Sequence, residues 1–545
     1  MRLQQNRLLD RPAFLLALAA FLTALLVQSG ELGSIDSINR LQTTHSYWTS
    51  KPSVPEGTVV KFAFGAVAVG KNGRMYVASG MGQSLLMLPS DIVGTLLEHL
   101  FHPGLRSIVV SYSTNILVCV LTVLVCFRWL RLLEFTPSES IAGALALLFG
   151  TTFLHYTQNM MENNLIFLLT LTGLCFQYEW LCTGSIRSLV IGCLVLGANL
   201  LVRLTTAMDI IAVGLFVLLV LLWKQGVRGR EVLTRIWNYV RVAGPCYAAF
   251  LVIDRAYQYH RFGSIFNTYL SIMAEQQKRV DASLPPDYPW STPLHEGLLG
   301  PLISPEKSIF LFDPLILLTV LLCLLLWKRF HPEMKALLVT GFSLLATYIL
   351  FYAKYFPWSG DFAWGDRYVT TPVQLLAMIS IPLLLRHRPD LGKIVPRLGM
   401  AIACISVVIQ LASVVFWHPL EIDQMETLGH PTFVIGLRFE NIAAVALGKM
   451  NQWGLSNQAT RKIDGIHADT PYFLPFLLRK DGRVSKRVAN GLIAGWSAGL
   501  AALIVVLWLI QSKARRGDFA ASAGARDSEA EDKTLGLRTG DSLLR

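Results

Sequence analysis

The sequence predicts an all-α polytopic membrane protein with about 12 transmembrane helices, sizeable outer loops and interfacial helices. Of its 545 residues, 53% are hydrophobic, only 15% are charged, and the mean hydropathy is +0.48. A soluble protein carries roughly 25% charged residues. Apolar runs of about 18 or more residues recur along the chain, and a helix of that length crosses a bilayer. The strands of a membrane β-barrel would alternate over ~10 residues, so these runs exclude that fold.

The first apolar run predicts an uncleaved signal anchor. Arg2, Arg7 and Arg11 precede an apolar stretch over residues 13–27, and positive charge before the first span keeps that end in the cytoplasm. A cleaved signal peptide is the alternative, because the run is short and small residues follow it. Either interpretation places residue 30 onward on the outer side.

The polar stretch over residues 30–106 is the first outer loop, and we expect the rest of the chain to be arranged around it. Asp36 lies a few residues past the end of the first span. The segment over residues 83–101 is apolar but interrupted by Pro89, Asp91 and Glu98. This pattern predicts a helix lying in the membrane interface rather than crossing it.

The remaining apolar runs complete the count of about 12 spans. They cover residues 107–127, 139–157, 162–181, 188–203, 205–223, 240–258, 308–327, 336–355, 370–385, 398–416 and 489–511. With the N-terminus inside, every predicted inner loop is basic, as the positive-inside rule requires. The residues concerned are Arg128, Arg131, Arg187, Lys224, Arg228, Arg230, Arg235, Arg241, Lys328, Arg329, Lys335, Arg386, Arg388, Lys393, Arg397, Lys513, Arg515 and Arg516. An even number of spans follows, with both termini cytoplasmic.

These boundaries divide the chain into four parts. Residues 1–416 form the main transmembrane region with its first loop at 30–106, residues 417–488 form a further outer loop region, and residues 489–511 form the last span. Residues 512–545 are rich in Ala, Gly, Ser and charged residues, a composition typical of a disordered cytoplasmic tail.

Several classes of protein are excluded by what the sequence lacks. The net charge of +12 is explained by the inner loops, so no nucleic-acid partner is predicted. The eight Cys residues lie in or beside apolar segments without a CxxC pair, and they are interpreted as packing residues. There is no Walker P-loop, GxGxxG after a strand, HExxH or zinc spacing, so any donor group is expected to arrive through the membrane.

Unusual polar residues gather at the outer rim of the predicted bundle. Ionisable groups near the hydrocarbon edge usually face a cavity or each other. Any one of these residues alone could equally be an ordinary loop charge or a functional residue. Their occurrence together on one side predicts a functional site there. The residues are Asp36, His155, Tyr156, Glu162, Arg203, Asp361, Asp366 and Arg367.

Five stretches of the sequence resemble the GT-C superfamily of membrane glycosyltransferases, most closely the bacterial relatives of dolichyl-phosphate-mannose–protein mannosyltransferases. The stretches are SIDSINRLQTTHSYW, NGRMYVASGMGQSLLMLPSDIVG, FGTTFLHYTQNMMENN, YHRFGSIFNTYL with GLLGPLISPEKSIFLFDPLIL, and WSGDFAWGDRYVTTP. The likeness extends over residues 14 to about 385. Many members of this superfamily carry two adjacent acids in the first loop, whereas here Asp36 stands alone and Glu31 lies five residues earlier.

The resemblance implies a transferase of the bacterial inner membrane with a periplasmic site, which moves a sugar from a polyprenyl-phosphate donor with inversion. A phosphate leaving group needs no general acid, so one carboxylate to deprotonate the acceptor hydroxyl is enough. Asp36 is the expected base. Arg367 and Arg203 are expected to bind the phosphate, because a guanidinium pairs with phosphate oxygens bidentately. Lys71 and Arg74 are second candidates for that role.

The remaining rim residues are predicted to support the acceptor or the site, and no cofactor is required. They are Glu162, His155, Tyr156, Asp361 and Asp366. A divalent metal is possible, but the sequence does not support one. Membrane lipids are expected partners. The acceptor is a lipid, a glycan or a protein, which the sequence does not distinguish. The alternative functions are a transporter or lipid flippase, which would place charges at the bilayer midplane, and a non-catalytic membrane assembly subunit.

Overall fold

The computed structural model describes residues 11–55, 58, 66–223, 229–360, 363–417, 419–456 and 469–516. In this part of the chain the secondary structure is almost entirely helical. Two short antiparallel strands, β1 (Val67–Val69) and β2 (Met75–Val77), form a hairpin in the first loop, with Val67 opposite Val77. The all-α fold predicted from the apolar runs is confirmed.

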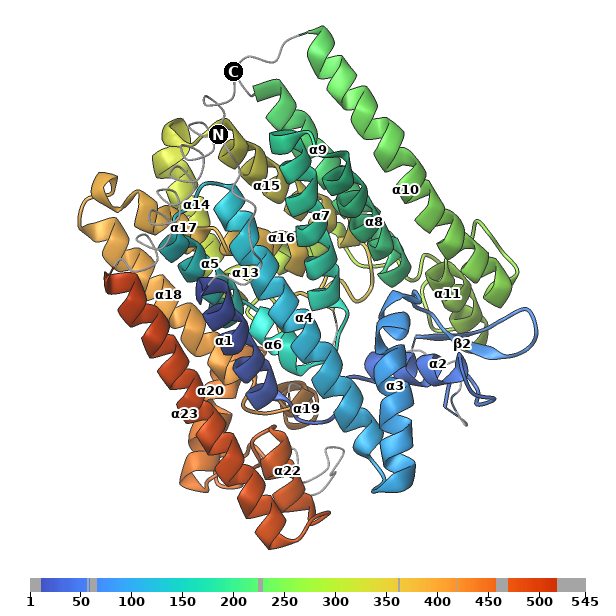
Figure 1. The fold of residues 1–545 in the computed structure, drawn as a ribbon. Helices are drawn as coiled ribbons and strands as arrows, with labels where there is room; N and C mark the ends of the chain where they lie inside the picture. The colour runs from blue at the N-terminus through green and yellow to red at the C-terminus, as the bar shows by residue number, and fades with distance from the viewer. Residues whose placement is uncertain are drawn as a thin grey trace, which may run out of the picture.

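A tilted bundle contains the helices that match the predicted spans, most of them long (Figure 1). They are α1 (Arg11–Val27), α4 (Leu105–Leu132), α5 (Pro137–Gly150), α7 (Asn163–Thr183), α8 (Ile186–Val202), α9 (Ala207–Trp223), α10 (Arg230–Phe262), α14 (Leu315–Leu326), α15 (Pro332–Tyr352), α16 (Thr370–Ala377), α17 (Ser380–Arg386), α18 (Ile394–Ser413) and α23 (Lys486–Arg516). Each of the predicted spans overlaps one of these helices or a consecutive pair.

Shorter helices connect the bundle or cover one end of it. They are α2 (Ile35–Ser46), α3 (Gly82–Leu100), α6 (Phe153–Gln158), α11 (Tyr269–Val280), α12 (Leu294–Ile303), α13 (Ile309–Phe312), α19 (Pro419–Leu428), α20 (Val434–Leu447) and α22 (Leu474–Asp481), with the 3₁₀ turns η1 (Leu204–Thr206), η2 (Trp327–Arg329) and η3 (Arg388–Asp390).

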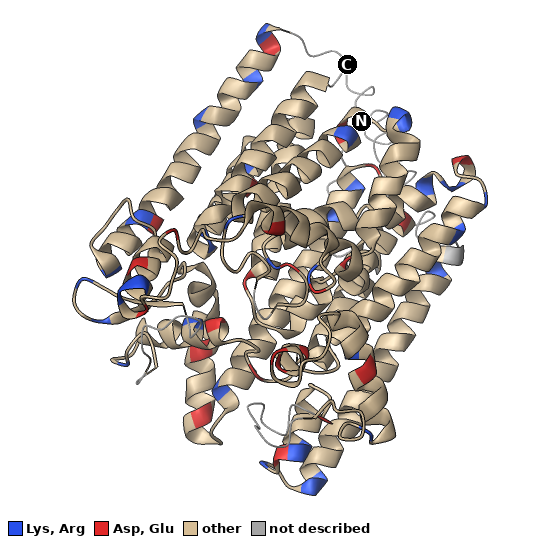
Figure 2. Ribbon diagram, turned by 180° about the vertical axis from the view of Figure 1, so that it is seen from behind, with Lys and Arg blue, Asp and Glu red and all other residues tan. Residues whose placement is uncertain are grey.

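Seven of the described helices are long and apolar enough to cross a membrane, and three shorter apolar helices accompany them. The apolar stretch of α7 is 72% buried inside the protein, whereas that of α10 is 6% buried. The first therefore lies at the centre of the bundle and the second at its periphery, where Figure 1 draws it. Figure 2 shows long stretches of helix without Lys, Arg, Asp or Glu, with the charges gathered near helix ends and in loops.

Polar contacts join helix ends at both ends of the bundle. Arg386, the last residue of α17, pairs with Glu139 at the start of α5 at 3.1 Å and donates to the carbonyl of Glu134. These residues belong to loops predicted on the same, inner side. At the opposite end of the bundle, the last turn of α1 packs against α23. The Trp496 indole of α23 donates to the carbonyl of Leu26 at 2.8 Å. Which end faces the cytoplasm stays a prediction.

Within the region predicted as a separate outer loop, residues 417–488, the described residues 419–456 pack on the end of the bundle through a buried ion pair. Arg438 of α20 pairs with Glu421 of α19 at 2.6 Å, and both side chains are fully buried. The same guanidinium donates to the carbonyls of Phe416 at 2.9 Å and Ser413 at 3.2 Å at the end of α18. Asn441 donates to Glu421 at 3.0 Å. The Arg438 and Asn441 donors satisfy the Glu421 carboxylate, and Arg438 also satisfies the carbonyls at the end of α18. The ion pair therefore fixes α19 and α20 on the bundle.

Arg438→Met is expected to lower the stability of the protein strongly. It leaves the Glu421 charge buried without its partner, which costs about 3–5 kcal/mol. Thermal unfolding in detergent should show a large fall in Tm. The double variant Arg438→Met, Glu421→Gln should recover part of that fall, because no unpaired charge remains. Equal destabilisation of the single and double variants would contradict this role for the pair.

Candidate functional site

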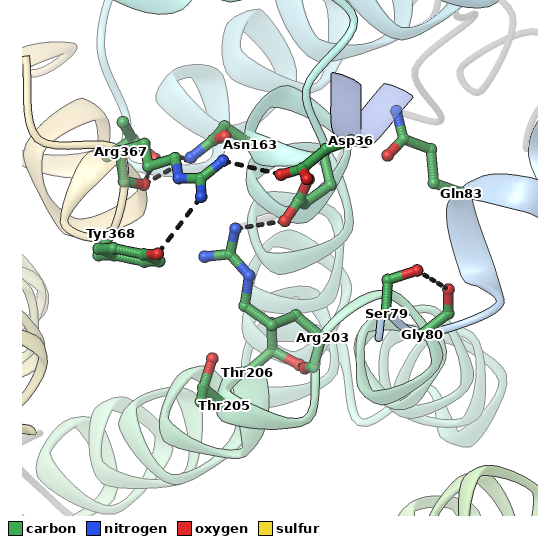
Figure 3. Close-up of polar contacts among 12 residues, drawn as sticks. Asp36, Ser79, Gly80, Gln83, Asn163, Arg203, Thr205, Thr206, Arg367 and Tyr368 are labelled. Atoms are coloured by element: carbon green, nitrogen blue, oxygen red, sulfur yellow. Dashed lines mark hydrogen bonds and ion pairs between the residues drawn. The ribbon is translucent and has the colours of Figure 1, made fainter. Parts of the chain in front are cut away.

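A cavity of about 420 Å³ lies at one end of the bundle, between α2, the β1–β2 hairpin, α11 and the ends of α8, α9 and α15. Its charged lining residues are Asp36, Arg40, Glu162, Arg203 and Arg367. Figure 3 shows Asp36, Arg203 and Arg367 pointing toward one another from three different segments. The structure thus brings together residues that are up to 331 positions apart in the sequence.

Helix α2 supplies one wall of the cavity because of how it starts. Ser34 caps the helix, with its side chain accepting from the backbone N–H of Ser37. Gly33 has φ +76 and a Cβ there would overlap Asn159, so the chain enters α2 through a turn that favours glycine. Asp36 follows in the first turn, where the helix dipole stabilises a carboxylate. Arg40 lies four residues later on the same helix face, and both side chains line the cavity.

Asp36 pairs with Arg367. Its Oδ2 lies 3.2 Å from Nη1 of the guanidinium, and the two side chains are 23% and 13% exposed. Arg367 belongs to the turn between α15 and α16, and its backbone carbonyl accepts from the Asn163 amide at 2.5 Å. Because the pairing uses Nη1, the rest of the guanidinium fork faces the other residues of the site.

Glu162 links two further arginines. It precedes α7, and its carboxylate pairs with Arg40 of α2 at 2.5 Å and with Arg203 at the end of α8. The Glu162 side chain is 6% exposed. A buried carboxylate that holds two guanidiniums fixes both of them in place, because breaking either pair leaves charge without compensation.

Aromatic rings back the arginines. The Arg203 and Arg367 guanidiniums lie 5.4 and 5.3 Å from the centroid of the Tyr368 ring, a distance at which the ring attracts a cation. Tyr368 stacks on Tyr352 with centroids 4.2 Å apart. The Tyr352 hydroxyl in turn bonds to Thr205 at 3.0 Å. The rings restrict where the guanidiniums can move.

The cavity therefore has one charged part and one apolar part. Three guanidiniums and two carboxylates leave a net charge of +1 among these five side chains. The remaining lining is mainly apolar or aromatic, and it includes Leu204, Ala207, Met208, Leu270, Met273, Trp290, Phe351 and Tyr355. An anionic head joined to an apolar chain matches both parts at once.

Other predicted site residues lie outside the cavity lining. His155 is fully buried and stacks on Trp364 with centroids 5.8 Å apart. The Tyr156 hydroxyl donates to the carbonyl of Trp364 at 3.1 Å. Asp366 accepts from the backbone N–H of Tyr368 at 2.9 Å and so orders the turn that carries Arg367. These three residues contact Trp364 or Tyr368 without lining the cavity themselves. Asp361 lies outside the described residues.

The two residues predicted as second candidates for phosphate binding are also placed away from the cavity. Lys71 and Arg74 are both exposed at the turn of the β1–β2 hairpin. Lys71 lies 4.9 Å from the centroid of the Tyr259 ring. Among the described residues, no group of three or more His, Cys, Asp or Glu side chains is placed to hold a metal ion.

Sequence reasoning missed Arg40 as a site residue. Its spacing of four from Asp36 would have placed both on one face of a helix, but residues 34–48 were treated as a loop rather than as a helix. The packing of α11 against the cavity had no signal in the sequence, because it depends on which outer loops meet.

Asp366 is a buried carboxyl in the turn between α15 and α16, and its surroundings alter its proton affinity. Burial raises the pKa of Asp366 to about 7 from its ordinary value of 3.8, although the Tyr368 N–H, Lys307, Arg367 and Arg203 act in the opposite direction. Desolvation disfavours the charged form of a buried carboxyl. This residue therefore changes charge near neutral pH.

The sequence matches no protein-family profile and no curated protein. Among solved structures, two similar chains have low sequence identity to this one. One is the archaeal oligosaccharyltransferase AglB from Archaeoglobus fulgidus in complex with an inhibitory peptide and a dolichol-phosphate, with 13% identity, a TM-score of 0.36, and coverage of 83% of this chain and 60% of that one.

Another is ArnT from Cupriavidus metallidurans bound to undecaprenyl phosphate, with 11% identity, a TM-score of 0.38, and coverage of 86% of this chain and 84% of that one. The chain thus spans 60% of the length of AglB. Because these identities and TM-scores are low, we infer the function from the residues that line the cavity.

Asp366→Asn is expected to change how stability depends on pH. A carboxyl whose pKa is raised on folding contributes stability that is fully present below its unfolded pKa and is lost as pH rises through its folded pKa. The loss should therefore develop from about pH 4 to about pH 7 in the wild type. The variant's Tm, relative to the wild type, should rise across that window. A Tm difference that does not change between pH 5 and pH 8 would contradict the buried protonated carboxyl.

Proposed function

We propose that this protein is an integral-membrane glycosyltransferase that moves a sugar from a polyprenyl-phosphate donor to an acceptor at the outer, periplasmic face of the bacterial inner membrane. One observation carries the proposal. Asp36 lies 3.2 Å from Arg367 in a cavity whose arginines carry one positive charge in excess and whose other part is apolar. The proposed base, phosphate site and lipid site would therefore adjoin one another.

The phosphate of the donor would bind among Arg203, Arg367 and Arg40. A phosphodiester carries one negative charge, which neutralises the net charge of these arginines and their two carboxylates. Guanidinium groups held by Glu162 and by the Tyr368 ring are already oriented before the donor arrives. Preorganised cations stabilise charge that develops on the leaving phosphate, and they cost no reorganisation during the reaction.

Asp36 would act as the general base. It accepts the proton of the acceptor hydroxyl while the hydroxyl oxygen attacks the anomeric carbon. The bond between that carbon and the phosphate oxygen breaks, and polyprenyl phosphate leaves with the bonding electrons. A single displacement of this kind inverts the anomeric carbon.

The apolar and aromatic part of the cavity would hold the first isoprene units of the donor. Met208 and Phe351 come from α9 and α15, two helices that are apolar enough to cross the membrane. A chain leaving the cavity between such helices remains in contact with lipid. The sugar and the acceptor, whether lipid, glycan or protein, would enter beside α2 and the β1–β2 hairpin.

Asp36→Asn is expected to lower sugar transfer by roughly 10²–10⁴-fold, the usual contribution of a general base. The amide has nearly the same shape but cannot take the proton. Purified protein in lipid would be given a panel of polyprenyl-phosphate sugars, and release of polyprenyl phosphate would be measured. Normal transfer by folded Asp36→Asn protein would refute this mechanism. Movement of a lipid-linked sugar between leaflets without any transfer would instead assign a flippase.

Arg203→Lys is expected to weaken the binding of undecaprenyl phosphate about 10-fold, or about 1.4 kcal/mol, because an ammonium cannot reproduce the bidentate contact. Lys71→Ala is the matched control, since this cation lies at the exposed hairpin turn. Binding can be followed by native mass spectrometry at increasing lipid concentration. Equal weakening by Lys71→Ala would move the phosphate site to the first loop.

A further inference from the structure

A second polar cluster lies in the first loop, away from the cavity lining, and it surrounds Asp91. This residue of α3 is fully buried. Its carboxylate accepts from Arg106 Nε of α4 at 2.5 Å and from the Trp48 indole at 2.7 Å, and it lies 3.1 Å from Nδ1 of His45. The sequence predicted a helix over residues 83–101 whose apolar run is interrupted at Asp91. The helix is α3, and in it Asp91 is a buried acceptor for three side chains.

The Asp91 cluster holds the C-terminal half of α2. His45 is in the last turn of α2, and Trp48 lies two residues past the end of the helix. Arg106, while bound to Asp91, also donates to the carbonyl of Leu41 at 3.2 Å. Two further hydrogen bonds join the same helices: Ser84 donates to the carbonyl of Arg40 at 3.1 Å, and Thr44 donates to the carbonyl of Ser84 at 3.0 Å.

We propose that Asp91 is a positioning residue for sugar transfer, which acts through α2 on Asp36. The inference rests on the function proposed above. α2 carries Asp36 in its first turn and is fixed at its other end by the Asp91 cluster. A rotation or tilt of this 12-residue helix would move the Asp36 carboxylate relative to Arg367 and Arg203, which belong to other segments.

The chemistry of the cluster supports a geometric role better than a purely stabilising one. A buried charged cluster is weak evidence for stability, because desolvation of the charges offsets their attraction. Three donors that converge on one carboxylate instead permit few orientations of the groups that carry them. A misplacement of about 1 Å in a reacting group can lower a rate 10²-fold. The cluster therefore fixes the angle of α2 at the cavity.

Asp91→Asn tests the inference, with Glu98→Gln as the matched control. Glu98 is on the same helix, and its carboxylate accepts from the backbone N–H groups of Gly104 and Arg106 at the start of α4, with no contact to α2 among them. Transfer would be measured per folded protein, together with the binding of undecaprenyl phosphate. We expect Asp91→Asn to lower kcat roughly 10- to 100-fold with a clearly smaller loss of donor affinity, because Arg40 moves with α2 while Arg203 and Arg367 keep their places.

Trp48→Phe provides a milder variant in case Asp91→Asn does not fold. It keeps a ring at a side chain that is 39% exposed and removes one hydrogen bond to Asp91. A several-fold fall in kcat with a smaller loss of donor affinity is expected. Glu98→Gln should lower stability without changing kcat. Equal kcat per folded protein for Asp91→Asn, Trp48→Phe and Glu98→Gln would overturn the inference.

A double-mutant cycle with Asp36→Asn separates the failure of this inference from that of the proposed function. If Asp91 acts through Asp36, adding Asp91→Asn to Asp36→Asn should cause little further loss, because contacting or coupled residues are not additive. Fully additive losses would overturn the inference and leave the base intact. Wild-type transfer by Asp36→Asn would refute the proposed base itself, and the inference with it.

Discussion

The structure of the site depends on one buried carboxylate, Glu162, which holds two arginines that come from different segments. Arg40 belongs to α2, and Arg203 ends α8. Without this carboxylate the two guanidiniums would repel each other at the edge of the hydrocarbon region. With it, they stay close, and one positive charge remains in excess once Asp36 and Arg367 are paired. The cavity can therefore accept one phosphate without collecting like charges in a low dielectric.

The same arrangement explains why a single carboxylate can serve as the base. Glu162 is committed to its arginines and is 6% exposed, whereas Asp36 is 23% exposed and has one guanidinium partner. The two acids thus have different surroundings and different tasks. A phosphate leaving group needs no proton, so no second acid has to be free.

The sequence predicted the fold well because lipid imposes strict rules on it. Apolar length located the helices, and basic loops set their parity. It also found Asp36, Glu162, Arg203 and Arg367, because charged residues at the membrane rim are rare and stand out. It could not find the packing between distant loops. Predicting the role of Arg40 required recognising α2 as a helix. Predicting the position of His155 required its contact with Trp364, and that of Lys71 its contact with Tyr259. Such contacts are set by tertiary packing rather than by local pattern.

The central claim is that the arginines around Asp36 bind the phosphate of a lipid. A structure determined by electron cryomicroscopy with undecaprenyl phosphate added would test it most directly. We predict density for the phosphate within hydrogen-bond distance of Arg203 and Arg367, with the isoprenoid chain beside Met208 and Phe351. A phosphate bound elsewhere, with these arginines still paired as they are here and the cavity empty of lipid, would contradict it.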